Sequence, residues 1–215
     1  MRVLDLGVRD YAEVWRLQKE LVVQRQVRVI PDTLILVEHL PVFTIGASRR
    51  NTPQEIGGIP CLGVERGGDI TFHGLGQLVG YPIIDLKDRG RDVHRFLRDL
   101  EEVLLRTLHD FSLDAQRKPG LTGVWVGSKK IASLGIAVRR WVSYHGFSLN
   151  VSVDLRYFRM IRPCGLDGAV MTSLSELLGR EVSTAEVKPV LLQHWAEIFC
   201  CADHALDVAS ITLRY

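Results

Sequence analysis

The chain has 215 residues, of which 47% are hydrophobic and 24% are charged, and its formal net charge is +2. A chain of this length buries one large core but is short for two, so we expect a single domain over residues 1–215, and its scattered basic residues give no reason to expect a nucleic-acid partner. No apolar stretch reaches the ~20 residues that span a bilayer, and an acid stands where a signal peptide would be apolar, so we expect no membrane partner and a cytoplasmic location.

The first element expected in chain order is an amphipathic helix over residues 10–28, with Asp10 as its N-cap and apolar residues at helical spacing. Short runs typical of strands follow, reading TLILVEH, VFTIG, DITFHG and LVGYPIIDL. A second amphipathic helix is predicted over residues 91–111. After it come the strand-like runs GVWVG and KIASLGIAVRRWVSYHGFSLNV.

Two helices are predicted near the end of the chain. Ser173 with Glu176, and Ser183 with Glu186, have the Ser-x-x-Glu spacing in which two side chains cap the free N–H groups of a helix. The strands cluster before these helices, and the helices are too few for a doubly wound parallel sheet. The pattern predicts an α+β fold with a mostly antiparallel or mixed sheet flanked by helices.

The stretch RGGDITFHGLGQLVGYP, residues 66–82, sets five glycines around one histidine. Gly67 and Gly68 are typical of a hairpin turn between the runs CLGVER and DITFHG. Glycines on both sides of His73, at a strand end, instead open room for a ligand beside the backbone. The spacing does not match a dinucleotide fingerprint, and no phosphate loop occurs in the chain. His73 by itself is better explained as a core or surface histidine than as a site residue.

The four cysteines have neither metal-ligand spacing nor the density of a disulfide framework, so we expect free thiols at Cys61, Cys164, Cys200 and Cys201. Cys164 stands in a loop-like setting, where a thiol is less shielded from substrate, although a buried inert cysteine is an open alternative. Lys130 shares a strand face with core residues in KKIASLGIAV. Most such lysines reach out to water, but a lysine held near a thiol could accept its proton.

Several separated blocks together resemble a known family. RGGDITFHGLGQLVGYP, KIASLGIAVRR, HGFSLNV and RPCGLDGAVMTSL are similar to the signature blocks of the lipoyl(octanoyl) transferases, and EHLPVFTIG resembles that family as well. The resemblance covers residues 33–178 in the right order. Leu75 departs from it, because the family usually has Pro there. The resemblance implies the α+β fold of biotin and lipoate protein ligases.

The resemblance also implies an activity and its partners. Members of the family transfer an octanoyl group from acyl carrier protein to a lysine of lipoyl domains, in 2-oxoacid dehydrogenases and in the glycine cleavage H protein, without a metal or another cofactor. Cys164 would carry the acyl group as a thioester, and Lys130 would be the general acid and base. The acyl pocket would be lined by Arg66, Gly67, Gly68, Asp69, Ile70, Thr71, Phe72, His73, Ser133, Leu134, Gly135, Gly146, Phe147 and Ser148.

Two alternatives remain open at this point. A lipoate or biotin protein ligase of the same fold would activate its acid with ATP, and a catalytically silent domain would bind acyl carrier or lipoyl proteins with Cys164 as an ordinary thiol. For the transferase we expect an apolar tunnel closed by a bulky residue such as Phe72 or Phe147. The glycine-rich stretch would then form a wall of that tunnel, shaped in part by His73.

Overall fold

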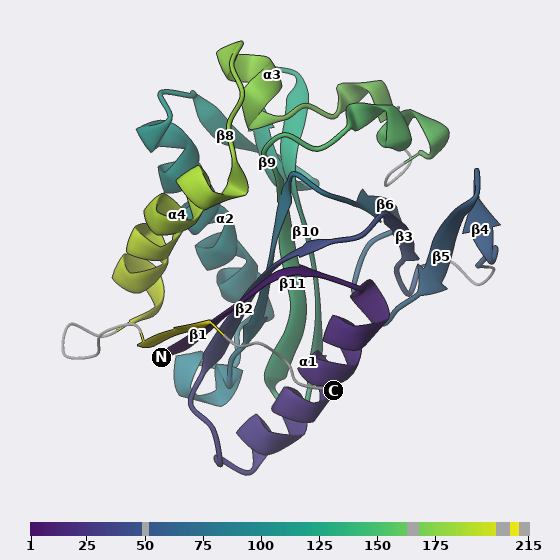
Figure 1. Cartoon of the computed structure of the whole chain (residues 1–215). Coiled ribbons are helices and arrows are strands. Elements are labelled where there is room, and N and C mark those ends of the chain that lie inside the picture. Colours follow the sequence, from purple (N-terminus) through teal and green to yellow (C-terminus); the bar gives the residue numbers. More distant parts are fainter. Residues whose placement is uncertain (49–51, 163–167, 201–206, 211–215) are drawn as a thin grey trace.

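The arrangement of strands and helices follows from a computed structural model, which describes residues 1–48, 52–162, 168–200 and 207–210 (Figure 1). The strands are β1 (Arg2–Arg9), β2 (Thr33–His39), β3 (Val42–Ile45), β4 (Glu55–Ile56), β5 (Ile59–Gly63), β6 (Ile70–His73), β7 (Gln77–Ile83), β8 (Ala115–Lys118), β9 (Leu121–Val126), β10 (Lys129–Arg139), β11 (Val142–Asn150) and β12 (Asp207–Ser210). The α-helices are α1 (Tyr11–Gln26), α2 (Val93–Asp110), α3 (Leu174–Leu178) and α4 (Thr184–Phe199). The 3₁₀ helices are η1 (Leu86–Arg89), η2 (Leu155–Met160) and η4 (Gly168–Val170).

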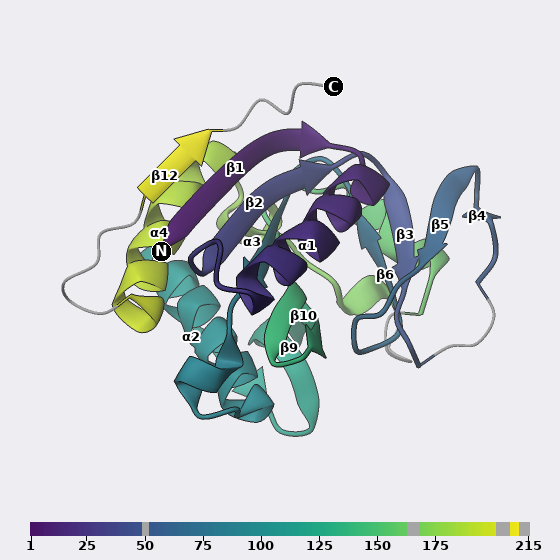
Figure 2. The same ribbon diagram turned by 90° about the horizontal axis from the view of Figure 1, so that it is seen from below.

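Two mixed sheets organise the part of the chain that the structure describes. The larger sheet has eight strands in the order β12-β1-β2-β7-β11-β10-β9-β8, and the smaller has four in the order β4-β5-β3-β6. β1 pairs in parallel with both β12 and β2, whereas the pairs β2–β7, β7–β11 and β11–β10 are antiparallel. Figure 2 shows β12 beside β1 at one side of the molecule. The predicted α+β class with a mixed sheet is thereby confirmed.

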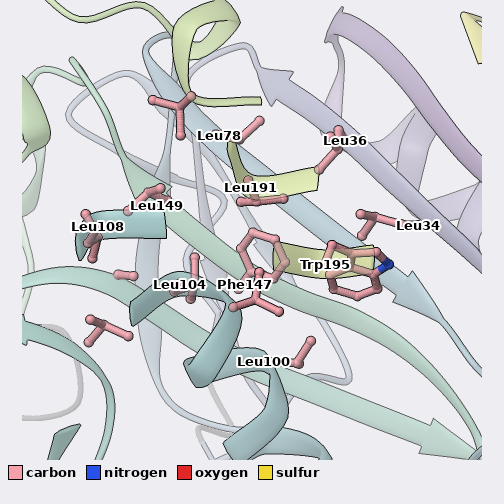
Figure 3. Packing of buried hydrophobic residues seen from close by; sticks show 14 of the residues in the cluster. Leu34, Leu36, Leu78, Leu100, Leu104, Leu108, Phe147, Leu149, Leu191 and Trp195 are labelled. Atoms are coloured by element: carbon pink, nitrogen blue, oxygen red, sulfur yellow. The ribbon is translucent and has the colours of Figure 1, made fainter. Parts of the chain in front are cut away.

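Helices cover both faces of the large sheet, because its central strands are apolar on both sides. Along β2, Leu34 and Leu36 point into one core and Ile35 points into another, as the two-residue period of a strand requires. The first core is completed by α2 and α4; Figure 3 shows Phe147 there among leucines and Trp195. The second core is completed by α1, so α1 and the α2–α4 pair lie on opposite faces (Figure 2).

The helix ends agree with the sequence signals. The Asp10 carboxylate accepts hydrogen bonds from the Ala12 and Glu13 N–H groups and starts α1. Ser173 and Ser183 are the N-caps of α3 and α4, as the Ser-x-x-Glu spacing predicts. No helix in the described ranges combines the length and the apolar character needed to cross a membrane.

The small sheet corrects one prediction. β5 and β6 do not form a hairpin with each other, because β3 lies between them, parallel to β5 and antiparallel to β6. The segment 64–69 is therefore a crossing connection and not a tight turn. It reaches the large sheet, where the Gly67 N–H donates to the Ile136 carbonyl at 2.9 Å. This contact brings the glycine-rich segment against β10.

A histidine ties the ends of α2 and α4 together. The His194 ring nitrogens lie 2.9 Å from the Asp110 carboxylate and 3.0 Å from the Glu197 carboxylate. Burial by itself lowers the pKa of His194, but the hydrogen bonds and charges of these two carboxylates outweigh it, so the net pKa is raised. The two carboxylates therefore favour the charged form of the imidazole between α2 and α4.

We expect this contact to make stability depend on pH. Because the folded-state pKa of His194 is raised, its contribution is fully present below the unfolded value of about 6.5 and is lost as the pH rises through the folded value. His194→Gln should therefore lower the urea midpoint at pH 6 more than at pH 9. Equal losses at both pH values would contradict the charged contact, and Asp110→Asn should reproduce the same trend in part.

Candidate active site

A cavity of about 520 Å³ lies where the 66–69 segment meets β10 and β11. This volume is within the range of pockets that hold small ligands. Its walls come from α1, the 66–69 segment, β6, β7, the start of α2, β9, β10 and β11. Segments far apart in the sequence therefore form one cavity.

Glycines allow backbone segments to approach each other closely at this cavity. A Cβ on Gly135 would lie 2.7 Å from the Gly67 carbonyl oxygen, and a Cβ on Gly146 would lie 2.1 Å from the Gly80 carbonyl oxygen. Backbone at those positions cannot give way, so neither site tolerates a side chain without a shift of the chain. The glycines thus allow the backbone to pack closely around the cavity.

The residues predicted to form the acyl pocket line this cavity, with one exception. Those on the wall are Arg66, Gly67, Gly68, Asp69, Ile70, Thr71, His73, Ser133, Leu134, Gly135, Gly146, Phe147 and Ser148. Phe72 is the exception: it is only 1% exposed, and its ring packs on Phe43, Tyr157 and Phe158 in the core below the small sheet. Phe72 points away because alternate residues of β6 face opposite sides, so it cannot close the cavity.

Phe147, the other residue expected to close the cavity, contributes only a small part of its wall. It touches the cavity, but its ring lies over Gly80 and belongs to the core under α2 and α4 (Figure 3). Replacing it by Ala would leave a void in that core and cost about 3–5 kcal/mol of stability. Phe147 is thus a core residue with one edge on the cavity.

Lys130 lies on the cavity wall and is only 6% exposed, whereas its neighbour Lys129 is exposed. Its Nζ atom is 5.6 Å from the centre of the Trp125 ring. Gly123, at a φ of 132°, makes room for the lysine chain, because a Cβ there would lie 2.5 Å from Lys130 Cε. The amine is therefore placed at the cavity by a specific packing of β9 against β10.

Cys164 lies outside the described residues, but the chain that follows it contacts Lys130. After η4, Met171 forms a parallel bridge with Lys130, and the Thr172 N–H donates to the Lys130 carbonyl at 2.9 Å. The other two cysteines that the structure describes lie elsewhere: Cys61 is buried on β5, and Cys200 follows α4.

Sequence reasoning missed a group of buried polar aromatic residues at the cavity, namely Tyr11, Tyr81 and His145. His39 lies behind them, donates through Nδ1 to the Arg9 carbonyl, and accepts from the Tyr81 hydroxyl at 2.8 Å. Burial lowers the pKa of His39 to about 4 and that of His145 to about 4, and it raises the pKa of Tyr81. This part of the wall is polar and uncharged at neutral pH, so the cavity is not the uniformly apolar tunnel expected from the sequence.

No group of three or more His, Cys, Asp or Glu side chains within the described ranges could hold a metal ion. The described wall supplies a buried amine, imidazoles, phenols, the Asp69 carboxylate and the Arg66 guanidinium. Arg66 donates to the Thr44 carbonyl at 2.8 Å and to the Gly67 carbonyl at 3.1 Å, which fixes the start of the 66–69 segment.

Comparison with known proteins shows which family the chain resembles. Residues 10–196 match the model of the lipoyl protein ligase A/B catalytic domain. An octanoyltransferase of Syntrophotalea carbinolica is 46% identical over 198 residues, which cover 92% of this chain and 94% of that protein. An octanoyltransferase of Rubrobacter xylanophilus is 47% identical over 201 residues, covering 89% and 90%.

The chain belongs to the lipoyl protein ligase A/B family. The predicted relation to lipoyl(octanoyl) transferases is thereby confirmed. Solved structures confirm the family's fold: a bi-partite lipoate protein ligase of Thermoplasma acidophilum superposes with a TM-score of 0.68 at 19% identity, covering 99% of this chain and 87% of that one. The biotin protein ligase of Aquifex aeolicus gives a TM-score of 0.54 at 14% identity, covering 92% and 68%.

Proposed function

We propose that this protein is an octanoyltransferase of lipoate biosynthesis, which moves an octanoyl group from acyl carrier protein to a lysine of lipoyl domains. The names and high identity of its relatives support the activity. The observation that carries the proposal is the placement of buried Lys130 on a cavity of ligand size, against the chain that follows Cys164. The acceptors would be lipoyl domains of 2-oxoacid dehydrogenases and the glycine cleavage H protein.

The reaction would proceed in two transfers. In the first, the Cys164 sulfur attacks the carbonyl carbon of the acyl carrier thioester, the new thioester forms, and the carrier leaves as a thiol that takes up the proton lost by Cys164. In the second, the acceptor lysine amine attacks the Cys164 thioester, the amide forms, and the C–S bond breaks. Lys130 would accept the proton in each attack and return it to the leaving thiolate.

The proposal is tested by mixing the protein with octanoyl-loaded acyl carrier protein without ATP and measuring its intact mass. We expect a mass increase of one octanoyl group, mapped to Cys164 after proteolysis, and transfer to a lipoyl domain added afterwards. A requirement for ATP would indicate a ligase instead. Binding of either protein partner without an adduct would indicate a non-catalytic domain.

We expect chain-length selectivity from the limited volume of the cavity, about 520 Å³. Each methylene moved from water into the cavity contributes about 0.8 kcal/mol, so a hexanoyl donor should lose roughly 1.6 kcal/mol, or about 15-fold in kcat/KM. A decanoyl chain must overpack the cavity, at about 1–3 kcal/mol, or leave its end outside. We expect initial rates that peak near eight carbons when carriers with six to twelve carbons are compared.

To enlarge the cavity, Ile136 is a better residue to replace than Phe147. Ile136 lines the cavity on β10, beside its register partner His145 on β11. Ile136→Ala should move the optimum toward longer chains. Val138→Ala, two residues further along the same strand and off the cavity wall, is the matched control and should leave the optimum unchanged. Wild-type rates that still rise at twelve carbons would contradict an enclosed acyl site.

A further inference from the structure

His73, on the cavity wall, is held in one tautomer. Its Nδ1 lies 2.7 Å from Gln77 Oε1, and the Gln77 amide nitrogen donates to the Phe72 carbonyl, so this oxygen must accept. Nδ1 therefore carries the proton, and Nε2 accepts from the Thr44 hydroxyl at 3.3 Å. Burial, together with the nearby His39, lowers the pKa of His73 well below its ordinary value. The ring is neutral and oriented from both sides.

From Gln77 a chain of buried hydrogen bonds runs to Lys130. The Gln77 amide nitrogen donates to Asn150 Oδ1 at 2.9 Å, and Asn150 Nδ2 donates to the Thr172 carbonyl at 2.9 Å. The Thr172 N–H in turn donates to the Lys130 carbonyl at 2.9 Å. Gln77, Asn150 and Thr172 are all buried, so water does not replace a lost link. Donors and acceptors alternate correctly at every step, which fixes the direction of the whole chain.

We infer that Gln77 and Asn150 are positioning residues for Lys130, which join the cavity wall at His73 to the main chain that holds the catalytic amine. The inference rests on the proposed function, since it assigns Lys130 a role in proton transfer. Neither side chain lines the cavity, and both would act through Thr172.

The sheet itself does not need these side chains. Gln77 and Asn150 are already register partners in the antiparallel pairing of β7 with β11. The segment of Met171 and Thr172, by contrast, follows a 3₁₀ helix and lies against Lys130 through the single bridge at the start of β10. The Asn150 amide adds a second hold on this segment from the neighbouring strand. Loss of that hydrogen bond should loosen the Met171–Thr172 segment against Lys130, whose other backbone neighbour is Trp125 of β9, while the rest of the sheet remains.

The test combines single and double substitutions in octanoyl transfer. A displacement of about 1 Å is enough to slow a reaction by about 10²-fold, so Asn150→Ala should slow formation of the acyl adduct by that order without changing KM for the octanoyl carrier. If Asn150 acts through Lys130, the double variant Asn150→Ala with Lys130→Ala should be no slower than Lys130→Ala alone. A purely structural loss would multiply with the Lys130 effect instead.

Thr107→Val is the matched control, because Thr107 donates a buried hydrogen bond to the Val103 carbonyl within α2, away from the cavity. It should lose stability but keep the acylation rate. Gln77→Leu breaks the same chain one link earlier and replaces Asn150→Ala if that variant fails to fold. Normal rates in Asn150→Ala and Gln77→Leu, or multiplicative losses in the double variant, would contradict this inference. Either result would leave the proposed function standing. A wild-type protein that forms no adduct overturns the proposed function and this inference together.

Discussion

Cys164→Ala is expected to abolish both the octanoyl adduct and transfer to the lipoyl domain. Removal of a covalent nucleophile leaves only binding and positioning, so the rate should fall by on the order of 10⁴- to 10⁶-fold. Intact-mass spectrometry and an acceptor-labelling assay measure the two losses separately. A variant that retains the adduct would show that another group carries the acyl chain.

The remaining cysteines are the controls for this result. Cys61 is buried in the small sheet, and burial raises the pKa of its thiol, so it is a poor nucleophile. Cys200 directly follows α4, and Cys201 lies outside the described residues. Alanine at Cys61, Cys200 or Cys201 should leave transfer largely intact.

Lys130→Ala is expected to slow acylation by about 10²- to 10⁴-fold, the usual effect of losing a general base. Arginine should not rescue the rate, because a guanidinium does not accept a proton near neutral pH. Single-turnover acylation measured by quenched flow gives the rate, and thermal unfolding checks that the variants fold.

Lys129→Ala is the matched control, since Lys129 precedes Lys130 on β10 and is exposed. It should acylate at the wild-type rate. Near-normal turnover of Lys130→Arg would mean that the residue supplies charge and not a proton acceptor.

Local signals in the sequence predicted the helices well. The ranges 10–28 and 91–111 correspond to α1 (Tyr11–Gln26) and α2 (Val93–Asp110), and the Ser173 and Ser183 caps are where the spacing predicted them. These features depend on residues within one or two turns of each other. Strand pairing, in contrast, depends on residues that are far apart in the sequence. The hairpin predicted at Gly67 and Gly68 was wrong because β3, which precedes both strands in sequence, separates them.

In the candidate site, too, residues within contiguous blocks were predicted, whereas residues that meet only in the folded chain were missed. The pocket residues from the 66–73, 133–135 and 146–148 blocks line one cavity except Phe72, which packs in the core below the small sheet. Tyr81 and His145 stand in the blocks RGGDITFHGLGQLVGYP and HGFSLNV but were not singled out, and Tyr11 lies outside every quoted block. The three residues come from α1, β7 and β11 and meet only in the folded chain. The one available signal was a polar aromatic residue at a buried position of each element.

The position of β7 between β2 and β11 has a consequence for synthesis of the protein. β2 precedes β7 in sequence, but β11 does not end until Asn150, so the cavity wall is completed by a distant strand. Pairing of this kind is slow compared with helix formation, since a long loop must close before any contact is gained. At about 5–20 residues per second, a ribosome takes on the order of 10 s to reach that strand. During that interval β7 lacks its partner strand β11, and apolar surface of β2 and β7 remains exposed. We therefore expect the nascent chain to need protection from aggregation until β11 is synthesised.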